Sequence, residues 1–289
     1  MAFEPHQPIH MPPLEVAPET FLLRCAQPAF GTPMSVNLNS LVIRGEQPVI
    51  VDTNTRGNRE AWLQDVFSLL QPADVRWVFL SHDDEDHTGN LAEILELCPN
   101  ATLVTNWAAN ERMGMEIAVP PHRMRWIDDG GLLDAGDRVL QAIRPPVYDS
   151  PTTRGLYDPV TGVYWGSDAF ATPMPAEPVE HVADLPADMW QEGMAVFHHH
   201  ALAPWLSMVR PDAYEAQVNR IRELEPRVLV SAHTPLIGGE SVATALDHIA
   251  NLPGVVPPPH PDQQLLDAVL AGAVPAGHDA APSNGVTAG

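Results

Sequence analysis

The sequence predicts an α/β domain in which helices pack outside two β-sheets. Short β-branched segments come in pairs near the N-terminus, and strand and helix segments then alternate along the chain. No hinge rich in proline or glycine divides the middle of the chain, so we expect one domain. Of the 289 residues, 45% are hydrophobic and 18% are charged, which is enough apolar material for a buried core.

The expected strands are short apolar runs bounded by turn residues. In order they are 21–25, 35–44, 48–52, 75–81, 102–105, 138–144, 162–165 and 227–231. The expected helices show apolar residues at helical spacing, as Trp62, Val66 and Leu69 do before Pro72 ends the first one. These helices are 58–70, 91–97, 107–115, 189–206, 212–224 and 240–249.

The two ends of the chain differ from this pattern. Residues 1–19 are rich in proline and are expected to form an extended arm; they show neither the basic nor the apolar region of a signal peptide. The main domain is expected at 20–252. Residues 253–289 read as a Pro/Ala-rich extension with one short helix at 262–271, and the last fifteen residues have the composition of a disordered tail.

Charge and cysteine content exclude several functions. All 15 cationic residues are arginine, against 37 Asp and Glu, and the net charge is −22. The absence of lysine excludes Schiff-base chemistry and lysine-based phosphate loops. So acidic a chain is not expected to bind nucleic acid or an anionic membrane, and no segment approaches the ~20 apolar residues of a spanning helix. Two cysteines form neither a disulfide framework nor a cysteine-rich metal site, so a cytoplasmic location is expected.

The most informative segment is His82-Asp83-Asp84-Glu85-Asp86-His87, which follows an apolar strand directly. Adjacent carboxylates repel one another where solvent screening is weak, and a bound cation compensates them. Alternate residues of an extended segment face the same side, so His82, Asp84 and Asp86 are expected to converge. His87 joins them as the next helix begins. The alternative is a solvated acidic turn, since charge runs are usually solvated.

This segment carries a family resemblance. The pattern Phe79-Leu80-Ser81-His82-x-Asp84-x-Asp86-His87-x-Gly89 resembles the signature loop of the metallo-β-lactamase fold, which usually reads H-x-H-x-D-H. An acidic third position resembles the flavodiiron branch, whose loop reads H-x-E-x-D-H. The resemblance extends from about residue 21 to residue 250. It implies a four-layer αββα sandwich and a site for two metal ions.

The resemblance implies further metal ligands downstream. Asp168, in Trp165-Gly166-Ser167-Asp168, matches the aspartate that bridges the two metals. His233, in Val230-Ser231-Ala232-His233, follows a strand as the last histidine of the family does. Asp168 can instead be read as a helix N-cap, and His233 as a buried histidine bonded to backbone.

One position departs from the family pattern. The family has a histidine where the spacing from both neighbouring motifs leads to Asp149, in Pro146-Val147-Tyr148-Asp149. Either Asp149 takes this role or the first metal lacks a ligand; Asp-Ser-Pro is also an ordinary turn opener. With Asp149 included, four carboxylates favour iron, with manganese or zinc as alternatives. The complete expected set is His82, Asp84, Asp86, His87, Asp149, Asp168 and His233.

Three further features carry open interpretations. Asp52 resembles the aspartate with which the family orients a ligand imidazole, or it is a turn residue. The run from Phe197 to His200 lines a substrate opening or lies on the surface of a helix. Arg154 binds an anionic substrate or pairs with one of the many acids.

The main expected function is a metal-dependent hydrolase. Two metal ions that share a water molecule generate hydroxide at neutral pH, which cleaves a small acyl ester or thioester. Asp86 is the expected catalytic residue, as the group that passes a proton to the leaving group. A homodimer is left open.

The alternative function is an oxygen- or nitric-oxide-reactive diiron protein with an external electron donor, as the flavodiiron resemblance implies. In that family a flavin-bearing flavodoxin domain follows the metal domain, whereas about forty residues follow Ile249 here. That is too short for such a domain, so no flavin is expected. A third reading is a structural relative that has lost its metals, although the retained ligand set argues against it.

Overall fold

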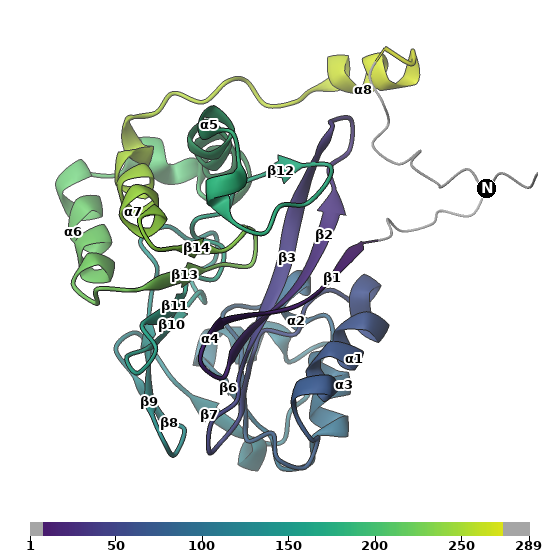
Figure 1. Ribbon diagram of the computed structural model, residues 1–289, viewed down its shortest axis with the longest axis vertical. Coiled ribbons are helices and arrows are strands. Elements are labelled where there is room, and N and C mark those ends of the chain that lie inside the picture. The colour runs from purple at the N-terminus through teal and green to yellow at the C-terminus, as the bar shows by residue number, and fades with distance from the viewer. Residues whose placement is uncertain (1–7, 274–289) are drawn as a thin grey trace, which may run out of the picture.

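Two mixed β-sheets lie face to face in the computed structural model, which describes residues 8–273 (Figure 1). The first sheet has the order β1 (Ile9–Ala17), β2 (Thr20–Pro28), β3 (Met34–Ile43), β4 (Val49–Val51), β5 (Trp77–Phe79), β6 (Thr102–Thr105) and β7 (Met124–Trp126), and β12 (Met174–Pro175) pairs with β3. The second has the order β14 (Ile237–Gly238), β13 (Val228–Val230), β11 (Val163–Trp165), β10 (Gly155–Asp158), β9 (Val139–Ile143) and β8 (Leu132–Asp134).

Helices cover the outer face of each sheet, as Figure 1 shows. On the first sheet these are α1 (Arg59–Leu69), α3 (Leu91–Leu97) and α4 (Trp107–Met113), with the short α2 (Glu85–Thr88) before α3. On the second they are α5 (Ala187–Phe197), α6 (Pro211–Arg222) and α7 (Ser241–Asn251). The predicted αββα sandwich is therefore confirmed. Helix α8 (Gln263–Leu270) follows at the C-terminal side.

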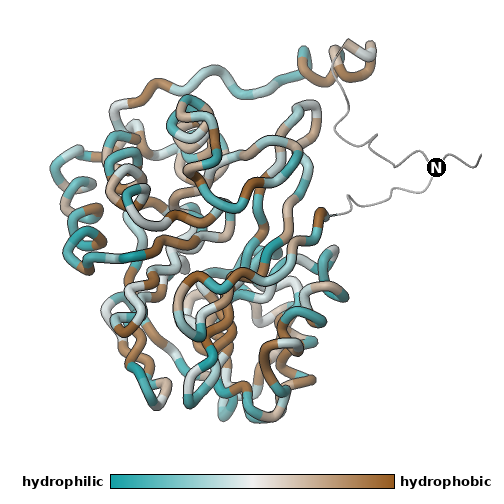
Figure 2. Tube along the Cα trace, viewed as in Figure 1, coloured by the Kyte–Doolittle hydropathy of each residue, from teal (hydrophilic) through white to brown (hydrophobic). Residues whose placement is uncertain are grey.

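Alternation along the strands produces these layers. Leu22 packs in the core between the sheets, whereas Leu23 packs under the helices of the first sheet. In the second sheet, Trp165 faces the core between the sheets and its neighbour Tyr164 faces the outer helices. Successive strand side chains point to opposite faces, so a strand that is apolar at every position is buried on both. Figure 2 shows apolar stretches along the strands and alternating hydropathy along the outer helices.

Parallel strand pairs bring the functional loops to one place. Strand β4 runs parallel to β5, and β11 runs parallel to β13. The loops that follow these strands carry Asp52, His82, Asp168 and His233 in turn. Since the carboxyl ends of parallel strands lie at one edge of a sheet, these side chains meet there.

The expected elements agree with the structure where periodicity is strong. Segments 91–97 and 102–105 match α3 and β6 at both ends. The predicted helix 189–206 is wrong as a single helix: α5 ends at Phe197, a π-helical turn spans His198–Leu202, and a 3₁₀ helix spans Pro204–Met208. Pro204 cannot donate a backbone hydrogen bond, so it ends the helical run.

The terminal segments are partly described. Residues 9–17 of the expected N-terminal arm form β1, which pairs antiparallel with β2 at the edge of the first sheet. The expected C-terminal helix corresponds to α8. The last fifteen residues lie outside the described part of the chain.

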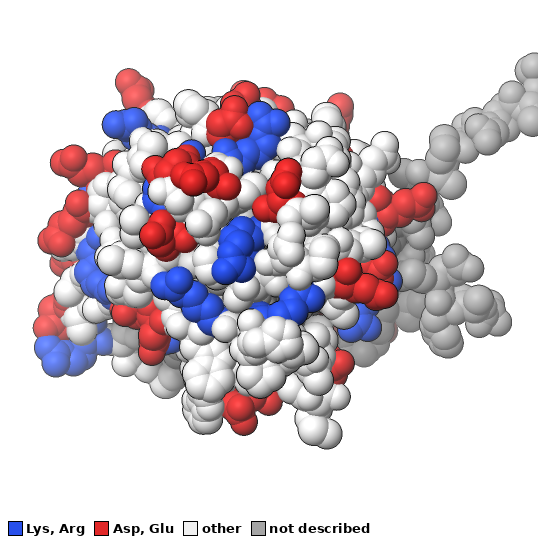
Figure 3. Space-filling view, turned by 90° about the horizontal axis from the view of Figure 1, so that it is seen from below, with Lys and Arg blue, Asp and Glu red and all other residues white. Residues whose placement is uncertain are grey.

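The described residues contain no helix that is long and apolar enough to cross a membrane. On the face seen in Figure 3, acidic and arginine side chains are interspersed rather than segregated by sign.

Candidate metal centre

In the loop between β5 and α2, alternate side chains face the same side, as predicted: His82 and Asp84 face the site, and Asp83 and Glu85 face away from it. His82 and His87 are fully buried at the centre of the site. Asp83 turns away: its Oδ1 accepts a hydrogen bond from Thr152 Oγ1 at 2.6 Å, and its Oδ2 lies 2.5 Å from Arg112 Nε. Glu85 also turns away and accepts hydrogen bonds from Thr55 and Arg56. The acidic run is therefore not a uniformly solvated turn.

Three overlapping groups of potential ligands form within this site: one joins His82, His87 and Asp168, and the other two are called the first and second ligand groups below. The first contains His82, Asp84 and Asp149: His82 Nε2 lies 3.6 Å from Asp84 Oδ2 and 3.9 Å from Asp149 Oδ1. In the second group, Asp86 Oδ2 lies 3.5 Å from His87 Nε2 and 3.2 Å from the Nε2 of His233.

Asp168 lies between the two groups. Its Oδ2 is 3.4 Å from His82 Nε2. Its Oδ1 is 2.9 Å from His87 Nε2 and 3.3 Å from the Nε2 of His233. All seven residues expected from the sequence are thus brought together, including Asp149.

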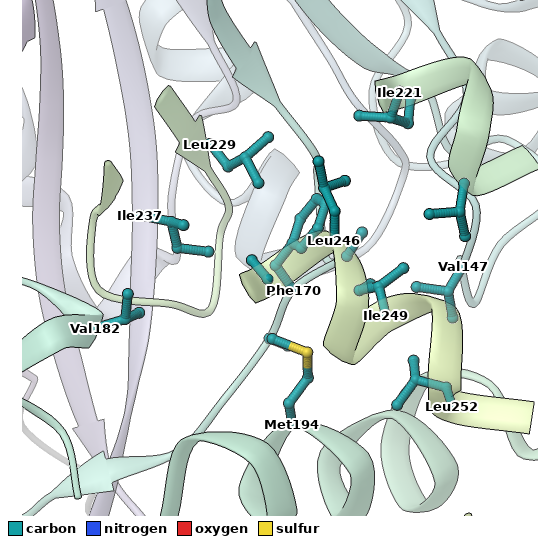
Figure 4. Close-up of a cluster of buried hydrophobic side chains, with 14 of the residues drawn as sticks. Val147, Phe170, Val182, Met194, Ile221, Leu229, Ile237, Leu246, Ile249 and Leu252 are labelled. Carbon is teal, nitrogen blue, oxygen red and sulfur yellow. The ribbon is translucent and has the colours of Figure 1, made fainter. Parts of the chain in front are cut away.

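A fixed loop holds Asp168 in this position. The next residue but one, Phe170, has a backbone φ of +70° and a fully buried ring. It packs in the cluster under the outer helices with Met194 and Leu246 (Figure 4). A positive φ is unfavourable for a bulky residue, so tertiary packing must hold this turn.

Each histidine of the first and second ligand groups is oriented through its Nδ1 nitrogen. His87 Nδ1 lies 2.8 Å from Asp52 Oδ2, His82 Nδ1 lies 3.1 Å from Ser167 Oγ, and His233 Nδ1 donates to the Asn37 carbonyl at 2.9 Å. Hydrogen bonds of this kind fix the tautomer of metal-ligating histidines and present Nε2 to the metal. The expected contact between Asp52 and a ligand imidazole is present.

The Asp52 carboxylate is itself held by several donors. Ser81 donates its backbone N–H to Oδ1 and its hydroxyl to Oδ2, each at 2.6 Å. Trp165 Nε1 donates to Oδ2 at 3.1 Å. Sequence reasoning did not assign roles to Ser81, Ser167 or Asn37. Ser81 directly precedes His82 and Ser167 directly precedes Asp168, whereas Asn37 comes from β3, which no local pattern connects with the site.

The unpaired atoms of the site fit metal ions. Four buried atoms have no hydrogen-bond partner within the described residues: His82 Nε2, His87 Nε2, Asp149 Oδ1 and Asp168 Oδ1. Burying such groups without a partner is costly, and a cation coordinated by them removes the cost. Imidazole nitrogens with carboxylate oxygens suit iron, manganese or zinc.

Electrostatic coupling shifts the ionisation of these groups strongly. Although burial opposes it, the adjacent carboxylates of Asp168 and Asp86 raise the pKa of His233 to about 10. Burial and the charge of Asp168 raise the pKa of Asp149 to about 6. Against the effect of burial, the His87 and His233 charges lower the pKa of Asp86. The proton-transfer role expected for Asp86 stays a prediction.

Arg154 and the run from Phe197 to His200 lie outside the two ligand groups. Arg154 pairs with Asp128 through its guanidinium, as one of its two interpretations predicted. Of the histidine run, His198 and His199 are buried, and the Phe197 ring stacks on His233 with a centroid distance of 5.8 Å.

Comparison with known proteins identifies the family. A family model described as "ODP family beta lactamase" matches residues 36–234. The chain belongs to this family. The predicted metallo-β-lactamase fold of the flavodiiron-like branch is therefore confirmed.

The region that matches this ODP family chain covers only part of each relative. The "Putative diflavin flavoprotein A 2" of Nostoc sp. is 30% identical over 165 residues, which cover 54% of this chain and 28% of the relative. The "Nitric oxide reductase" of Moorella thermoacetica is 22% identical over 66% of this chain and 47% of the relative. The chain thus spans less than half the length of these two curated relatives.

Solved structures show the same fold. The rubredoxin oxygen:oxidoreductase of Desulfovibrio gigas matches with a TM-score of 0.68 and 15% identity, over 83% of this chain and 61% of that one. The flavodiiron protein of Giardia intestinalis matches with a TM-score of 0.70 and 17% identity, over 85% and 60%.

These comparisons correct one expectation about this ODP family member. The predicted ester or thioester hydrolase is wrong, because the matched proteins are oxidoreductases by name. The error has a physical origin: a two-metal site of histidines and carboxylates suits Lewis-acid and redox chemistry alike, and the ligand set alone does not separate them.

Proposed function

We propose that the chain binds two iron ions among these seven residues and reacts with dioxygen or nitric oxide, using an external electron donor. The position of Asp168 carries the proposal. One of its carboxylate oxygens faces His82, and the other faces His87 and His233. This is the arrangement that a carboxylate needs in order to bridge two metal ions.

The remaining ligands divide between the two ions. We assign His82, Asp84 and Asp149 to the first ion, and Asp86, His87 and His233 to the second, because these groups cluster in the structure. Four carboxylates in one centre favour iron or manganese over zinc. The names of the relatives, which include a nitric oxide reductase and a flavodiiron protein, favour iron.

The protein surroundings suit a small gaseous substrate. The histidine side chains are buried, whereas the side chains of Asp84, Asp86 and Asp149 are 49%, 26% and 19% exposed. Small molecules therefore reach the centre from its carboxylate side. Two ferrous ions bound there would supply electrons to a diatomic gas.

A reductant must replace those electrons. Cys25 and Cys98 are both buried and belong to different segments of the chain, so they provide no iron–sulfur centre. We propose that a separate reductant, such as a flavoprotein, delivers electrons to this domain.

Gas uptake by the reduced protein tests the proposal. The metal-free chain is loaded without oxygen either with ferrous iron or with zinc, and dioxygen and nitric oxide consumption are followed with electrodes. We expect consumption by the iron-loaded protein with reductant, and none by the zinc-loaded protein. An inert protein that holds two iron ions per chain would contradict the proposal.

A further inference from the structure

His198 lies close enough to Asp168 and His233 for their charges to act on it, and it belongs to neither ligand group. It begins the π-helical turn His198–Leu202, directly after α5, and its side chain is fully buried. The preceding residue, Phe197, stacks on His233, so this turn packs against the second half of the centre. Single π-helical turns occur frequently at functional sites.

The backbone fixes the tautomer of His198. Its Nδ1 lies 2.7 Å from the Met194 carbonyl oxygen. A carbonyl only accepts hydrogen bonds, so Nδ1 carries the proton and Nε2 carries the lone pair. This Nε2 is buried and has no hydrogen-bond partner among the described residues.

The neighbouring histidines do not share this feature. His199 Nε2 donates to the Leu252 carbonyl at 2.9 Å, and His200 Nε2 donates to the Pro258 carbonyl at 2.8 Å. Both are explained by packing of the turn against the C-terminal segment. His198 instead shows the pattern of the ligand histidines, with Nδ1 held and Nε2 free.

Electrostatics keep the His198 ring neutral. Burial lowers its pKa to about 4, and the nearby charges of Asp168 and His233 act on it in opposite directions. A neutral ring with its proton on Nδ1 offers only an acceptor at Nε2. Burying an acceptor without a partner is unfavourable, so a donor in the pocket is the natural complement.

We propose that His198 is a positioning residue whose Nε2 accepts a hydrogen bond from an O–H group inside the metal pocket. This inference rests on the proposed function, in which the pocket holds two metal ions. A fixed acceptor favours an occupant that carries a proton, such as water, and disfavours an occupant that only accepts, such as azide. His198 would thus bias the centre toward hydroxylic products over proton-free ligands.

Nitrogen NMR of the unmodified full chain tests the geometry. The protein is labelled with ¹⁵N-histidine and loaded with zinc, which is redox-silent and therefore separates this test from the gas-uptake experiment. We expect a protonated Nδ1 and an Nε2 resonance shifted upfield from a free acceptor nitrogen, as hydrogen bonding causes. A free-acceptor position, a zinc-bound nitrogen or the reverse tautomer would each overturn the proposal.

Azide binding to the zinc-loaded protein tests the consequence. His198→Phe removes the Nε2 lone pair and keeps a planar ring. We expect azide to bind about fivefold more tightly, because the repulsion between that lone pair and azide, which both only accept hydrogen bonds, is lost. The control His200→Phe changes a histidine whose Nε2 is bonded to the Pro258 carbonyl and should leave azide affinity unchanged. Unchanged or weaker azide binding by a folded His198→Phe protein would overturn the proposal.

Discussion

Asp149 stands where the family pattern has a histidine. Its carboxylate lies near His82 Nε2 and contributes to the first ligand group only. Its position was predictable because the spacing from two motifs converged on it. The orientation of its side chain was not, since Asp-Ser-Pro also forms ordinary turns.

Replacing Asp149 should affect one metal and spare the other. We expect Asp149→Ala to weaken the first iron by at least about tenfold, because that ion loses a carboxylate, while the second keeps its three unshared ligands. Iron retained per chain after dialysis against graded chelator measures this. Parallel loss of both ions would show that the two halves do not bind independently.

Asp52 acts through His87. Asp52→Asn leaves only one acceptor oxygen, so its amide nitrogen must face either the His87 Nδ1 proton or the Ser81 backbone N–H, and it can accept neither. We expect metal affinity to fall by about 10–100-fold, the usual effect of losing the group that orients a ligand histidine. Calorimetric titration with zinc checks this value. Wild-type affinity in the variant would mean that packing alone orients His87.

At the scale of elements, the junction between α2 and α3 is constrained by Gly89. A Cβ atom built there would lie 2.5 Å from the Asn54 carbonyl oxygen and 2.6 Å from the Arg56 amide nitrogen. Both are backbone atoms, which cannot rotate away. The glycine of the sequence motif is therefore required for close approach of two loops that carry the site.

Gly89→Ala should accordingly destabilise the chain. We expect the free energy of unfolding of the metal-free protein to fall by more than about 2 kcal/mol, since the backbone must shift. Urea denaturation measures it. Gly57→Ala is the matched control, because no atom lies within 4 Å of the added Cβ, and it should change stability little. Equal stability of the two variants would contradict this account.

The elements differed in how far the sequence could predict them. Helix α3 and strand β6 have strong local periodicity, and both were predicted at their observed ends. Strands β12 and β14 have two residues each and depend on pairing with distant strands, so no local pattern marks them. The π-helical turn is likewise held by contacts to the C-terminal segment, through Leu252 and Pro258.

For the whole molecule, metal binding and protonation must compete at the centre. The pKa of His233 is raised to about 10, and that of His87 is raised well above its ordinary value, so both are protonated at pH 7 without metal. A metal binds only the neutral imidazole, so each proton must leave. Affinity should therefore rise with pH up to about 10.

We expect loading at pH 7 to release more than one proton per chain. Calorimetric titration with zinc in two buffers of different ionisation enthalpy counts these protons. The zinc-loaded protein serves as its own control, because a second addition of metal should release none. Heat that is independent of the buffer would show that the histidines are neutral before metal binds.

The fold was predictable for the whole molecule, whereas the reaction class was not. Paired strand segments followed by strand–helix alternation indicated the layers, and the motif from Phe79 to Gly89 indicated the sandwich and its site. The same ligands serve hydrolysis and redox chemistry, so the expected hydrolase was overturned only by comparison with relatives. What separates the two reactions is the identity of the metal and its electron supply.

Anomalous diffraction at the iron edge tests the central claim most directly. Crystals of the chain loaded anaerobically with ferrous iron should show two iron peaks on either side of Asp168, one beside His82, Asp84 and Asp149, the other beside Asp86, His87 and His233. A single peak, or iron bound elsewhere while these side chains remain unliganded, would contradict the account.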